Sequence, residues 1–510
     1  MDKTGLVSTF DSTLDSPKGL VMVSRPRRFG KSFAAQSLVA FYSCGCDSRI
    51  LFEGREVSQC RGWDAHLNRY NVITLDMSGV IQALGVDNVV PGIASWLLPE
   101  LRKIAPDAGL LHEGEGIELK AAIQDVVDTT GRKFVFVIDE WDAPYRLAQE
   151  DTVAQDAYAE WLRALFKDSV FTPNAVAGAY LTGILPIKKY SHQSAVSDFW
   201  EYTMVGAGDY APYIGFSESD VKALCCEHGL DLDDVRRWYD GYGVLGNGTQ
   251  TYDVYAPYSV MRACAIGRTG SYWPSTETYR LLIHYIDMNF DGLQDDLVRA
   301  IGGDPIDVNP DGFQNDMVSI ESRDDVLTLL VHLGYLAYNA VARAARVPNG
   351  EVRRELVRTV RHSRHPRLQK LVRESSDLLR SIVDMDEKAV ADGFARVHQR
   401  DCHPLFYNDE QALRAVVKTA LVAAIDEYAR VEELPGGRGY ADVVYLPRRG
   451  SRMPALVVEL KWNKHVEEAV NQIRQRGYQE VLEGLGVPML LVGITYDPKT
   501  REHTSRVELA

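Results

Sequence analysis

Four apolar runs mark the first third of the chain, and each of them ends in polar residues. The runs lie at 20–24, 71–76, 134–138 and 177–183, and the sequence between them has the periodicity of helices. Continuous apolar runs of this length are typical of buried parallel strands that helices cover on both faces. The pattern therefore predicts an α/β layered fold with a parallel sheet.

The hydrophobic pattern becomes helical in the middle of the chain. Short helices are predicted at 218–226 and 233–239, and a buried helix at 324–333. Residues 292–316 are rich in Gly, Asp and Pro, which predicts a long loop. The rest of the chain is predicted to form helices, then two strands, a further helix and a final strand at 489–494. The three predicted regions are an α/β domain at 1–205, a helical region at 206–375 and a second α/β domain at 376–510.

Composition sets limits on the class of protein. Hydrophobic residues make up 45% of the 510 residues, so a packed core can form without metals or disulfides. The net charge of -15 argues against a cationic coat for wrapping nucleic acid, although phosphate binding depends on local charge. No second pair among the seven cysteines has zinc-site spacing, and no apolar run nears a membrane span. We therefore expect a cytoplasmic protein that does not enter a membrane.

A phosphate-binding sequence follows the first apolar run. Residues 24–32 read Ser-Arg-Pro-Arg-Arg-Phe-Gly-Lys-Ser and open a predicted helix. In a P-loop, backbone N–H groups cradle the phosphates, the lysine reaches the β/γ oxygens and the hydroxyl holds Mg²⁺. Lys31 and Ser32 fit these roles, although Arg25 stands where the general pattern has its first glycine. The predicted ATP-binding loop residues are Arg28, Phe29, Gly30, Lys31 and Ser32.

Two carboxylates follow the third apolar run. Asp139 stands at the strand end, where P-loop enzymes place an acid that organises the magnesium shell. We therefore predict that Asp139 and Ser32 bind Mg²⁺, and that Glu140 polarises the attacking water. Thr182, at the end of the fourth run, is a candidate for contact with the γ-phosphate. A polar strand end without this role is the alternative.

Three charged residues interrupt the first two strands of the C-terminal region. Asp442 lies in the run 440–446, and Glu459 and Lys461 lie in the run 455–461. Glu459 and Lys461 are two positions apart and share one strand face, which Asp442 can meet from the partner strand. Buried charges are costly unless they are paired or bind metal. The pattern predicts Asp442 and Glu459 as Mg²⁺ ligands and Lys461 as a catalytic cation, with a solvent-facing edge strand as the alternative.

Neighbouring segments add to this second predicted site. Glu410 begins a helix before the strands and is a candidate third carboxylate, and Gln472 and Tyr478 follow on a later helix. A basic stretch at 353–373 is either a contact for a nucleic-acid backbone or a surface helix face paired with acidic neighbours.

Together these motifs resemble those of bacterial AAA-ATPase-like proteins that carry a C-terminal PD-(D/E)xK nuclease domain. The resemblance covers nearly the whole chain and implies a P-loop NTPase domain, a helical lid or linker and a restriction-endonuclease-like domain. It also implies ATP binding and a nuclease-type metal site, and Arg25 is the usual residue of that family. The matching stretches include RPRRFGKS at 25–32, DEWDAP at 139–144, LTGI at 181–184, WYDGY at 238–242, VPNGE at 347–351, NDEQ at 408–411, EELP at 432–435, GYAD at 439–442 and VELKWN at 458–463.

The leading functional hypothesis is an ATP-gated, Mg²⁺-dependent nuclease that acts on DNA. Two alternatives stay open: a nucleotide-switched protein whose nuclease fold binds nucleic acid or a partner without cutting, and an ATPase scaffold. The residues do not distinguish DNA from RNA, and they leave homo-oligomer formation open. Because the family opens with a YVDKT-like segment and this chain begins Met-Asp-Lys-Thr, we expect a shortened N-terminus.

Overall fold

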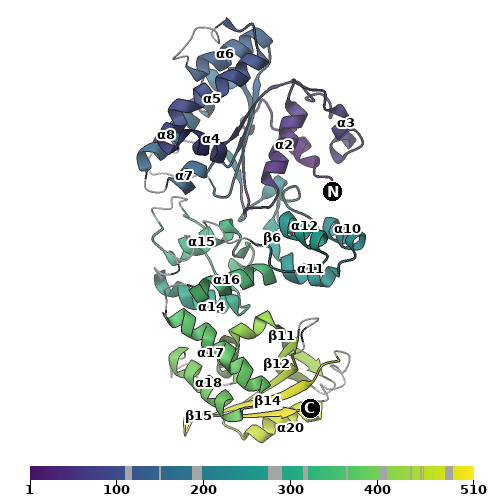
Figure 1. Ribbon diagram of the computed structural model, residues 1–510, viewed down its shortest axis with the longest axis vertical. Coiled ribbons are helices and arrows are strands. Elements are labelled where there is room, and N and C mark those ends of the chain that lie inside the picture. The colour runs from purple at the N-terminus through teal and green to yellow at the C-terminus, as the bar shows by residue number, and fades with distance from the viewer. Residues whose placement is uncertain are drawn as a thin grey trace. The chain divides into compact units, whose positions relative to one another are not determined.

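The chain forms two compact units in a computed structural model (Figure 1). The first unit comprises Met1–Thr278 and Asp307–Val352, and the second comprises Tyr279–Ile306 and Arg353–Ala510. The predicted boundaries near 205 and 375 stay predictions. The structure describes residues 1–109, 118–148, 151–186, 198–273, 286, 290–313, 320–362, 366–401, 410–436, 439–447, 451, 453–476 and 486–510.

A five-stranded parallel sheet is the centre of the first unit. Its strand order is β2-β3-β4-β1-β5, so β4 lies between the strand that precedes the predicted phosphate loop and the strand that ends in two acids. The four predicted strands are confirmed, whereas β5 has only three residues and too short a pattern to predict. The strands are β1 (Leu20–Ser24), β2 (Asn71–Asp76), β3 (Phe134–Asp139), β4 (Val176–Gly183) and β5 (Trp200–Tyr202).

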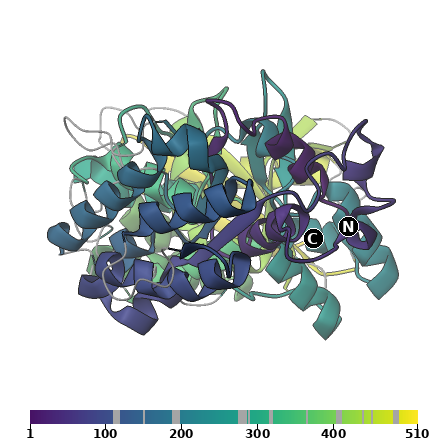
Figure 2. The same ribbon diagram turned by 90° about the horizontal axis from the view of Figure 1, so that it is seen from above.

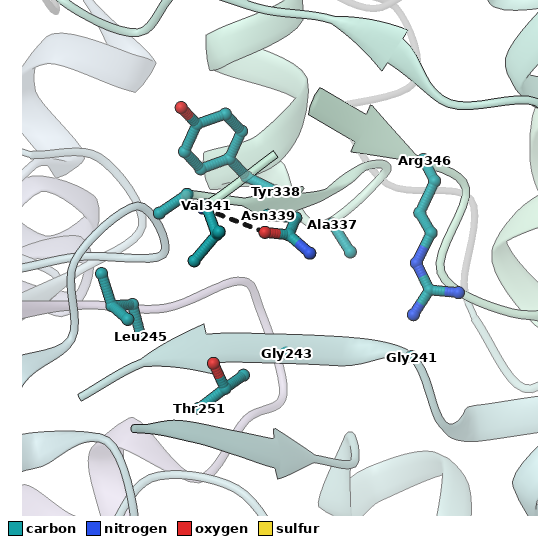
Figure 3. A pocket seen from close by; sticks show the side chains of 10 residues that line it. Gly241, Gly243, Leu245, Thr251, Ala337, Tyr338, Asn339, Val341 and Arg346 are labelled. Carbon is teal, nitrogen blue, oxygen red and sulfur yellow. Dashed lines mark hydrogen bonds between the residues drawn. The ribbon is translucent and has the colours of Figure 1, made fainter. Parts of the chain in front are cut away.

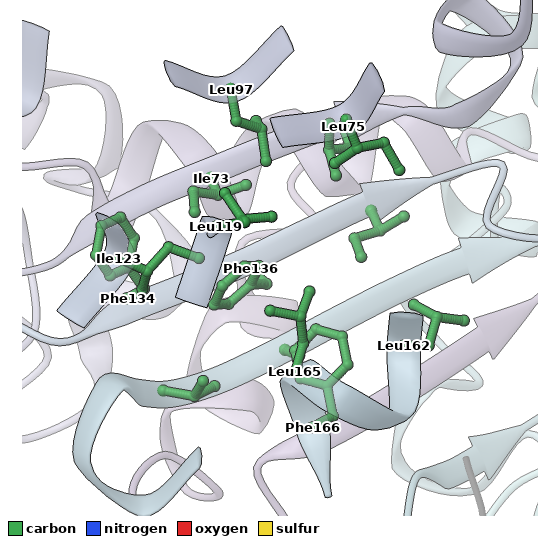
Figure 4. Close-up of a cluster of buried hydrophobic side chains, with 14 of the residues drawn as sticks. Ile73, Leu75, Leu97, Leu119, Ile123, Phe134, Phe136, Leu162, Leu165 and Phe166 are labelled. Atoms are coloured by element: carbon green, nitrogen blue, oxygen red, sulfur yellow. The ribbon is translucent and has the colours of Figure 1, made fainter. Parts of the chain in front are cut away.

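Helices cover both faces of this sheet, as the apolar runs predict. On one face, Ile73, Leu75, Phe134 and Phe136 pack against helices (Figure 4). On the other face, Phe10 of α1 contacts Tyr180 of β4 at 6.0 Å between ring centroids. The blue helices of the first face also lie along one side of the strands in the turned view of Figure 2. The helices are α1 (Gly5–Asp11), α2 (Lys31–Tyr42), α3 (Arg49–Phe52), α4 (Met77–Leu84), α5 (Val89–Ile104), α6 (Leu119–Thr130), α7 (Ala143–Leu147), α8 (Thr152–Phe166) and α9 (Phe171–Ala175).

The middle of the chain is helical with two small hairpins. The three predicted helices are confirmed as α10, α11 and α15, but the predicted long loop at 292–316 is wrong because α14 occupies part of it. Leu293, Leu297 and Ile301 give α14 one buried face, a signal that the Gly and Asp content concealed. The elements are α10 (Glu218–His228), α11 (Leu232–Tyr239), β6 (Tyr242–Leu245), β7 (Thr251–Val254), α12 (Pro257–Ile266), α14 (Leu293–Ile301), β8 (Ile306–Asp307), α15 (Arg323–Leu333), β9 (Ala337–Asn339), β10 (Ala344–Arg346) and α16 (Gly350–His362).

A mixed five-stranded sheet is the centre of the second unit. Its order is β11-β12-β13-β14-β15, and only the β13–β14 pair is parallel. Helices α17, α18 and α19 pack on one face, and α20 packs on the other. The elements are α17 (Pro366–Val383), α18 (Glu387–Asp401), α19 (Glu410–Ala420), β11 (Tyr428–Gly436), β12 (Gly439–Pro447), β13 (Ala455–Trp462), α20 (Val466–Arg476), β14 (Met489–Asp497) and β15 (Glu502–Leu509).

In the described parts of the chain, no single helix has the length and apolar character that a membrane span requires. The pair Met77–Leu84 and Val86–Ile104 reaches those limits only when taken together, and it is bent by 105°.

Gly241 joins two segments of the first unit that are far apart in sequence. Its φ is 103°, and a Cβ added to it would lie 2.1 Å from the carbonyl oxygen of Pro348. Beside it, Asn349 Nδ2 donates a hydrogen bond to the Asp240 carbonyl at 2.9 Å. The WYDGY and VPNGE motifs therefore form one packed junction.

We expect Gly241→Ala to lower the free energy of unfolding by about 2–5 kcal/mol, because left-handed strain and overpacking add. Gly229→Ala is the matched control, since Gly229 has φ 67° with nothing within 4 Å of an added Cβ. Chemical denaturation followed by circular dichroism measures both variants. Equal losses would show that the close approach to Pro348 has no energetic weight.

Two candidate functional sites

The predicted phosphate-binding loop connects β1 to α2. Gly30 caps α2 in the left-handed conformation at φ 89°, and Arg28 also has a positive φ of 70°. The first N–H groups of a helix have no partner within the helix, so they are available to phosphate oxygens. The loop thus has the backbone form that a phosphate-binding loop requires.

Ser32 and Asp139 meet across the sheet edge. The Ser32 hydroxyl lies close enough to the Asp139 carboxylate to act against a rise in its pKa, but burial acts more strongly and raises the pKa of Asp139. The strand register explains the meeting, because Thr182 of β4 lies opposite both Val23 of β1 and Asp139 of β3. A hydroxyl and a carboxylate in contact are the pair that Mg²⁺ would use beside a nucleotide.

Lys31 lies beneath the loop. Its side chain is buried, and its Nζ donates a hydrogen bond to the Pro26 carbonyl at 2.9 Å. Burial lowers the pKa of Lys31 to about 8, although Asp142 and Asp139 act in the opposite direction. Lys31 is therefore mainly cationic near neutral pH.

Glu140 is held by residues that the sequence pattern did not predict. Its backbone has a positive φ of 49°, and its carboxylate accepts hydrogen bonds from Ser78 of α4 and from Arg146 of α7, the latter at 2.8 Å. Burial acts to raise the pKa of Glu140, but these hydrogen bonds and the Arg146 charge lower it below its usual value. An ionised carboxylate at this edge is able to accept a hydrogen bond from a water molecule.

Asp142 connects the acidic strand end to the fourth strand. It is fully buried, and its Oδ2 accepts backbone N–H groups of Ile184 and Leu185 at 3.0 Å each. The same oxygen pairs with Arg146 Nε at 3.2 Å. Asp142 therefore links the DEWD motif at 139–142 to the segment that begins with the LTGI motif at 181–184.

Two buried hydroxyl groups lie at the ends of the neighbouring strands β1 and β4. Thr182 Oγ1 and Ser24 Oγ have no hydrogen-bond partner among the described residues, although both side chains are fully buried. Buried polar groups are normally satisfied by protein, water or ligand. Together with the Ser32–Asp139 contact, this arrangement fits a bound nucleotide with Mg²⁺, for which Lys31 and Ser32 would bind phosphate and metal.

Two aromatic residues of the middle region contact side chains of the phosphate-binding loop. Phe29 is buried and packs edge-to-face on Tyr242, with 5.1 Å between the ring centroids. The Arg28 guanidinium lies 4.0 Å from the ring centroid of Tyr258 on α12. Of these two predicted loop residues, Phe29 has its side chain in the protein core, and Arg28 has its side chain against an aromatic ring.

Arg25 takes the place of the usual first glycine. Its buried guanidinium donates hydrogen bonds to the carbonyls of Ser24, Tyr202 and Tyr210 at 2.8, 3.3 and 3.5 Å. Burial lowers the pKa of Arg25 to about 10, so it stays charged. Arg25 therefore ties the loop to β5 and to the segment that follows it.

The three charged residues of the C-terminal sheet are brought together as predicted from strand spacing. Val443 of β12 and Val458 of β13 form a pair of the ladder, and Asp442 and Glu459 are the residues next to this pair on the two strands. Asp442 Oδ2 accepts the backbone N–H of Leu460 at 2.8 Å. Glu459 is almost fully buried, and its Oε1 accepts a hydrogen bond from Lys461 Nζ at 3.1 Å. Asp442 is thus bound to the strand residue between Glu459 and Lys461, and these two residues contact each other.

Two further side chains reach these acids from helices. Arg414 of α19 pairs with Asp442 Oδ1 at 2.7 Å. The side-chain amide of Gln472, on α20, donates a hydrogen bond to Glu459 Oε1. Gln472 was suggested by its place on the predicted helix, whereas Arg414 had no local signal, since only the tertiary fold brings α19 to β12.

Glu410 is the first residue of α19, one turn before Arg414. Its side chain, like Tyr478, lies outside the described residues. In the described part of the chain, no group of three or more His, Cys, Asp or Glu residues could hold a metal ion. The fit to Mg²⁺ therefore rests on the Asp442 and Glu459 carboxylates, which are oxygen donors of the kind this ion prefers.

The basic stretch has one exposed face. Arg354 and Arg358 of α16 are exposed and lie one helical turn apart, and Lys370 of α17 lies 3.8 Å from Glu374. Both predicted roles of the stretch therefore stay predictions.

Two hollows occur away from these residues. Figure 3 shows the first, a cavity of about 70 Å³ between the β6 and β9 hairpins, where Asn339 Oδ1 accepts the Val341 N–H at 3.0 Å. It has room for a few water molecules. The second, of about 400 Å³, lies where β1 and β4 begin, and Lys133 and Asp15 are among its lining residues. No predicted site residue lines either hollow.

The parallel sheet with its loop, and the mixed sheet with its paired acids and lysine, define a P-loop ATPase-like fold followed by a nuclease-like α/β fold. Residues 1–192 match the family described as predicted AAA-ATPase, and residues 408–506 match the PD-(D/E)XK nuclease superfamily. The N-terminal region of the chain is therefore similar to the first family, and the C-terminal region is similar to the second.

The chain is similar to an uncharacterized protein in the vnfD 5' region of Azotobacter chroococcum mcd 1. The two are 22% identical over 518 residues, which cover 98% of this chain and 93% of the relative. A solved structure, the Walker-type ATPase PABY2304 of Pyrococcus abyssi, matches with a TM-score of 0.35 at 14% identity, over 69% of this chain and 94% of that one.

Proposed function

We propose that this protein binds and hydrolyses ATP and that its C-terminal region is a Mg²⁺-dependent nuclease, gated by ATP and acting on DNA. The observation that carries the nuclease half is the meeting of Asp442, Glu459 and Lys461 on paired strands. The position of Ser32 beside the Asp139 carboxylate, at the end of the loop that Lys31 supports, favours the ATP half.

Each residue has a definable task in this proposal. Lys31 would hold the β/γ-phosphates, and Ser32 and Asp139 would hold the nucleotide's Mg²⁺, while Glu140 accepts a hydrogen bond from the attacking water. In the second site, Asp442 and Glu459 would hold a metal that lowers the pKa of a bound water. Lys461 would stabilise the charge that develops on the scissile phosphate.

The direct test incubates the full chain with DNA, Mg²⁺ and ATP beside the Lys461→Ala variant. We expect Lys461→Ala to cleave about 10²-fold more slowly, because one cation is lost from the site. Lys499→Ala, at an exposed turn after β14, is the matched control and should cleave normally. Equal cleavage by wild type and Lys461→Ala removes the nuclease claim, and cleavage unaffected by ATP removes the gating claim.

A second candidate is a nucleotide-switched binding protein whose nuclease fold grips nucleic acid or a partner without cutting. The observation that favours it is that both acids already have cationic partners, Arg414 and Lys461. Tight DNA binding at low salt, without Mg²⁺-dependent cleavage, would select this function over the first.

A further inference from the structure

The Glu140 carboxylate is held through one of its two oxygens. Its Oε2 accepts a hydrogen bond from the Ser78 hydroxyl and another from Arg146 Nη2, the latter at 2.8 Å. None of the described residues donates a hydrogen bond to Oε1, and the side chain of Glu140 is 37% exposed. The protein therefore fixes one oxygen and leaves the other open to water.

The turn after β3 brings Arg146 back to Glu140. Glu140 has a φ of 49°, a left-handed conformation that a residue with a side chain keeps only where the surrounding structure holds it. Its carbonyl accepts the Ala143 N–H at 2.8 Å, so α7 begins directly after this turn and carries Arg146 beside Glu140. The strained backbone and the two donors to Oε2 thus fix the direction of this side chain together.

Arg146 is also held by a second carboxylate. Its Nε lies 3.2 Å from Asp142 Oδ2, and its side chain is only 8% exposed. The same Asp142 oxygen accepts the N–H groups of Ile184 and Leu185 at 3.0 Å each. A guanidinium presents its N–H groups in fixed directions within one plane, so it can contact two carboxylates at once. Arg146 therefore bridges Asp142 and Glu140.

The end of β4 packs closely against Asp142. A Cβ added to Gly183 would lie 2.7 Å from Trp141 Cδ1 and 2.8 Å from Asp142 Oδ1. The Thr182 carbonyl accepts the Trp141 N–H at 3.1 Å. This packing fixes Asp142, and through it Arg146, relative to the strand end where Thr182 lies.

We propose that Arg146 is a positioning residue for ATP hydrolysis, which fixes Oε2 of Glu140 so that Oε1 accepts the hydrogen bond of the attacking water. This inference rests on the ATP half of the proposed function. Ser78 holds the same oxygen from α4, and Asp142 holds the arginine. A carboxylate whose direction is set before the substrate arrives loses little entropy when it engages the water.

The test measures steady-state ATP hydrolysis by the full chain. Arg146→Gln should lower kcat by about 10²-fold, because the carboxylate loses its fixed direction. Its KM for ATP should stay near the wild-type value, since an interaction that acts on the attacking water changes turnover and not substrate binding. Arg146→Lys keeps the charge but lacks the planar group that reaches two carboxylates, so its kcat should stay reduced. Arg49→Gln, which removes an exposed arginine paired with Asp64, is the matched control and should hydrolyse ATP normally.

A double-mutant cycle distinguishes positioning from a general structural role. In a Glu140→Gln background, Arg146→Gln should lower kcat by less than about 2-fold further, because Arg146 acts through Glu140. A full further loss in the double variant, or a wild-type kcat in folded Arg146→Gln, overturns the proposal. If Arg146→Gln does not fold, Arg146→Lys takes its place in the cycle, and a wild-type kcat then refutes the bridge.

Failure of the proposed function gives a different result. A wild-type protein that does not hydrolyse ATP, or a Glu140→Gln protein that hydrolyses it at the wild-type rate, removes the proposed ATPase chemistry and the positioning role with it. A slow Glu140→Gln protein beside a normal Arg146→Gln protein removes the positioning role alone.

Discussion

Lys31→Ala is expected to lower the rate of ATP hydrolysis by about 10² to 10³-fold. The loss follows from the removal of a preorganised cation that acts where charge develops on the phosphates. Lys31 is buried and close enough to Asp139, Glu140 and Asp142 for their charges to influence its pKa. Its removal also takes a positive charge away from these acids, of which Glu140 and Asp142 keep Arg146, so binding of a fluorescent ATP analogue should weaken as well.

Lys133→Ala is the control for this result. Lys133 precedes β3 at the opposite edge of the same sheet and pairs with Asp15 at 2.7 Å on the surface. It should keep wild-type hydrolysis. A Lys31→Ala protein that hydrolyses ATP like the Lys133→Ala protein would show that nucleotide turnover does not use this loop.

Asp442→Asn is expected to reduce Mg²⁺-dependent DNA cleavage by about 10³-fold. An amide at this position still accepts the Leu460 N–H, so the strand pairing is kept. The metal, however, loses an anionic ligand, and with it several kcal/mol of stabilisation of the developing charge. The positive charge of Arg414 is then no longer offset by Asp442, which makes binding of a divalent cation still less favourable.

The rate should be measured with a labelled duplex over a range of Mg²⁺ concentrations, since a weakened site needs more metal. Asp377→Asn on α17 is the control, because Asp377 is exposed and pairs with Arg380 at 3.6 Å. Full cleavage by the Asp442→Asn protein at ordinary Mg²⁺ concentrations would exclude Asp442 as a ligand.

Strands with a mainly apolar sequence were predictable, and the charged, alternating strand β15 was not. β1, β3 and β4 are buried along nearly their whole length, and β2 alternates buried and more exposed residues. β15 alternates exposed and buried residues over Glu502–Leu509, and its many charged residues concealed that period.

The chemistry-bearing residues could be predicted where they stand on the strands themselves. Asp139, Asp442 and Glu459 follow or interrupt apolar runs, and that break in pattern is a local signal. The partners of these acids come from other elements: Ser78 and Arg146 hold Glu140, and Arg414 holds Asp442. Nothing in a neighbouring sequence marks such partners, because only the folded chain brings them near. The contact of Phe29 with Tyr242 belongs to the same class.

The arginine at the start of the phosphate loop has a consequence for the entropy of nucleotide binding. A glycine-rich loop gains its shape from flexible backbone and must be ordered when the ligand arrives. Here the Arg25 guanidinium fastens the loop to three carbonyls, and Phe29 is fixed in the core. Much of the ordering has thus occurred during folding, and on the proposed function a nucleotide would meet a loop whose conformation is already fixed by the protein.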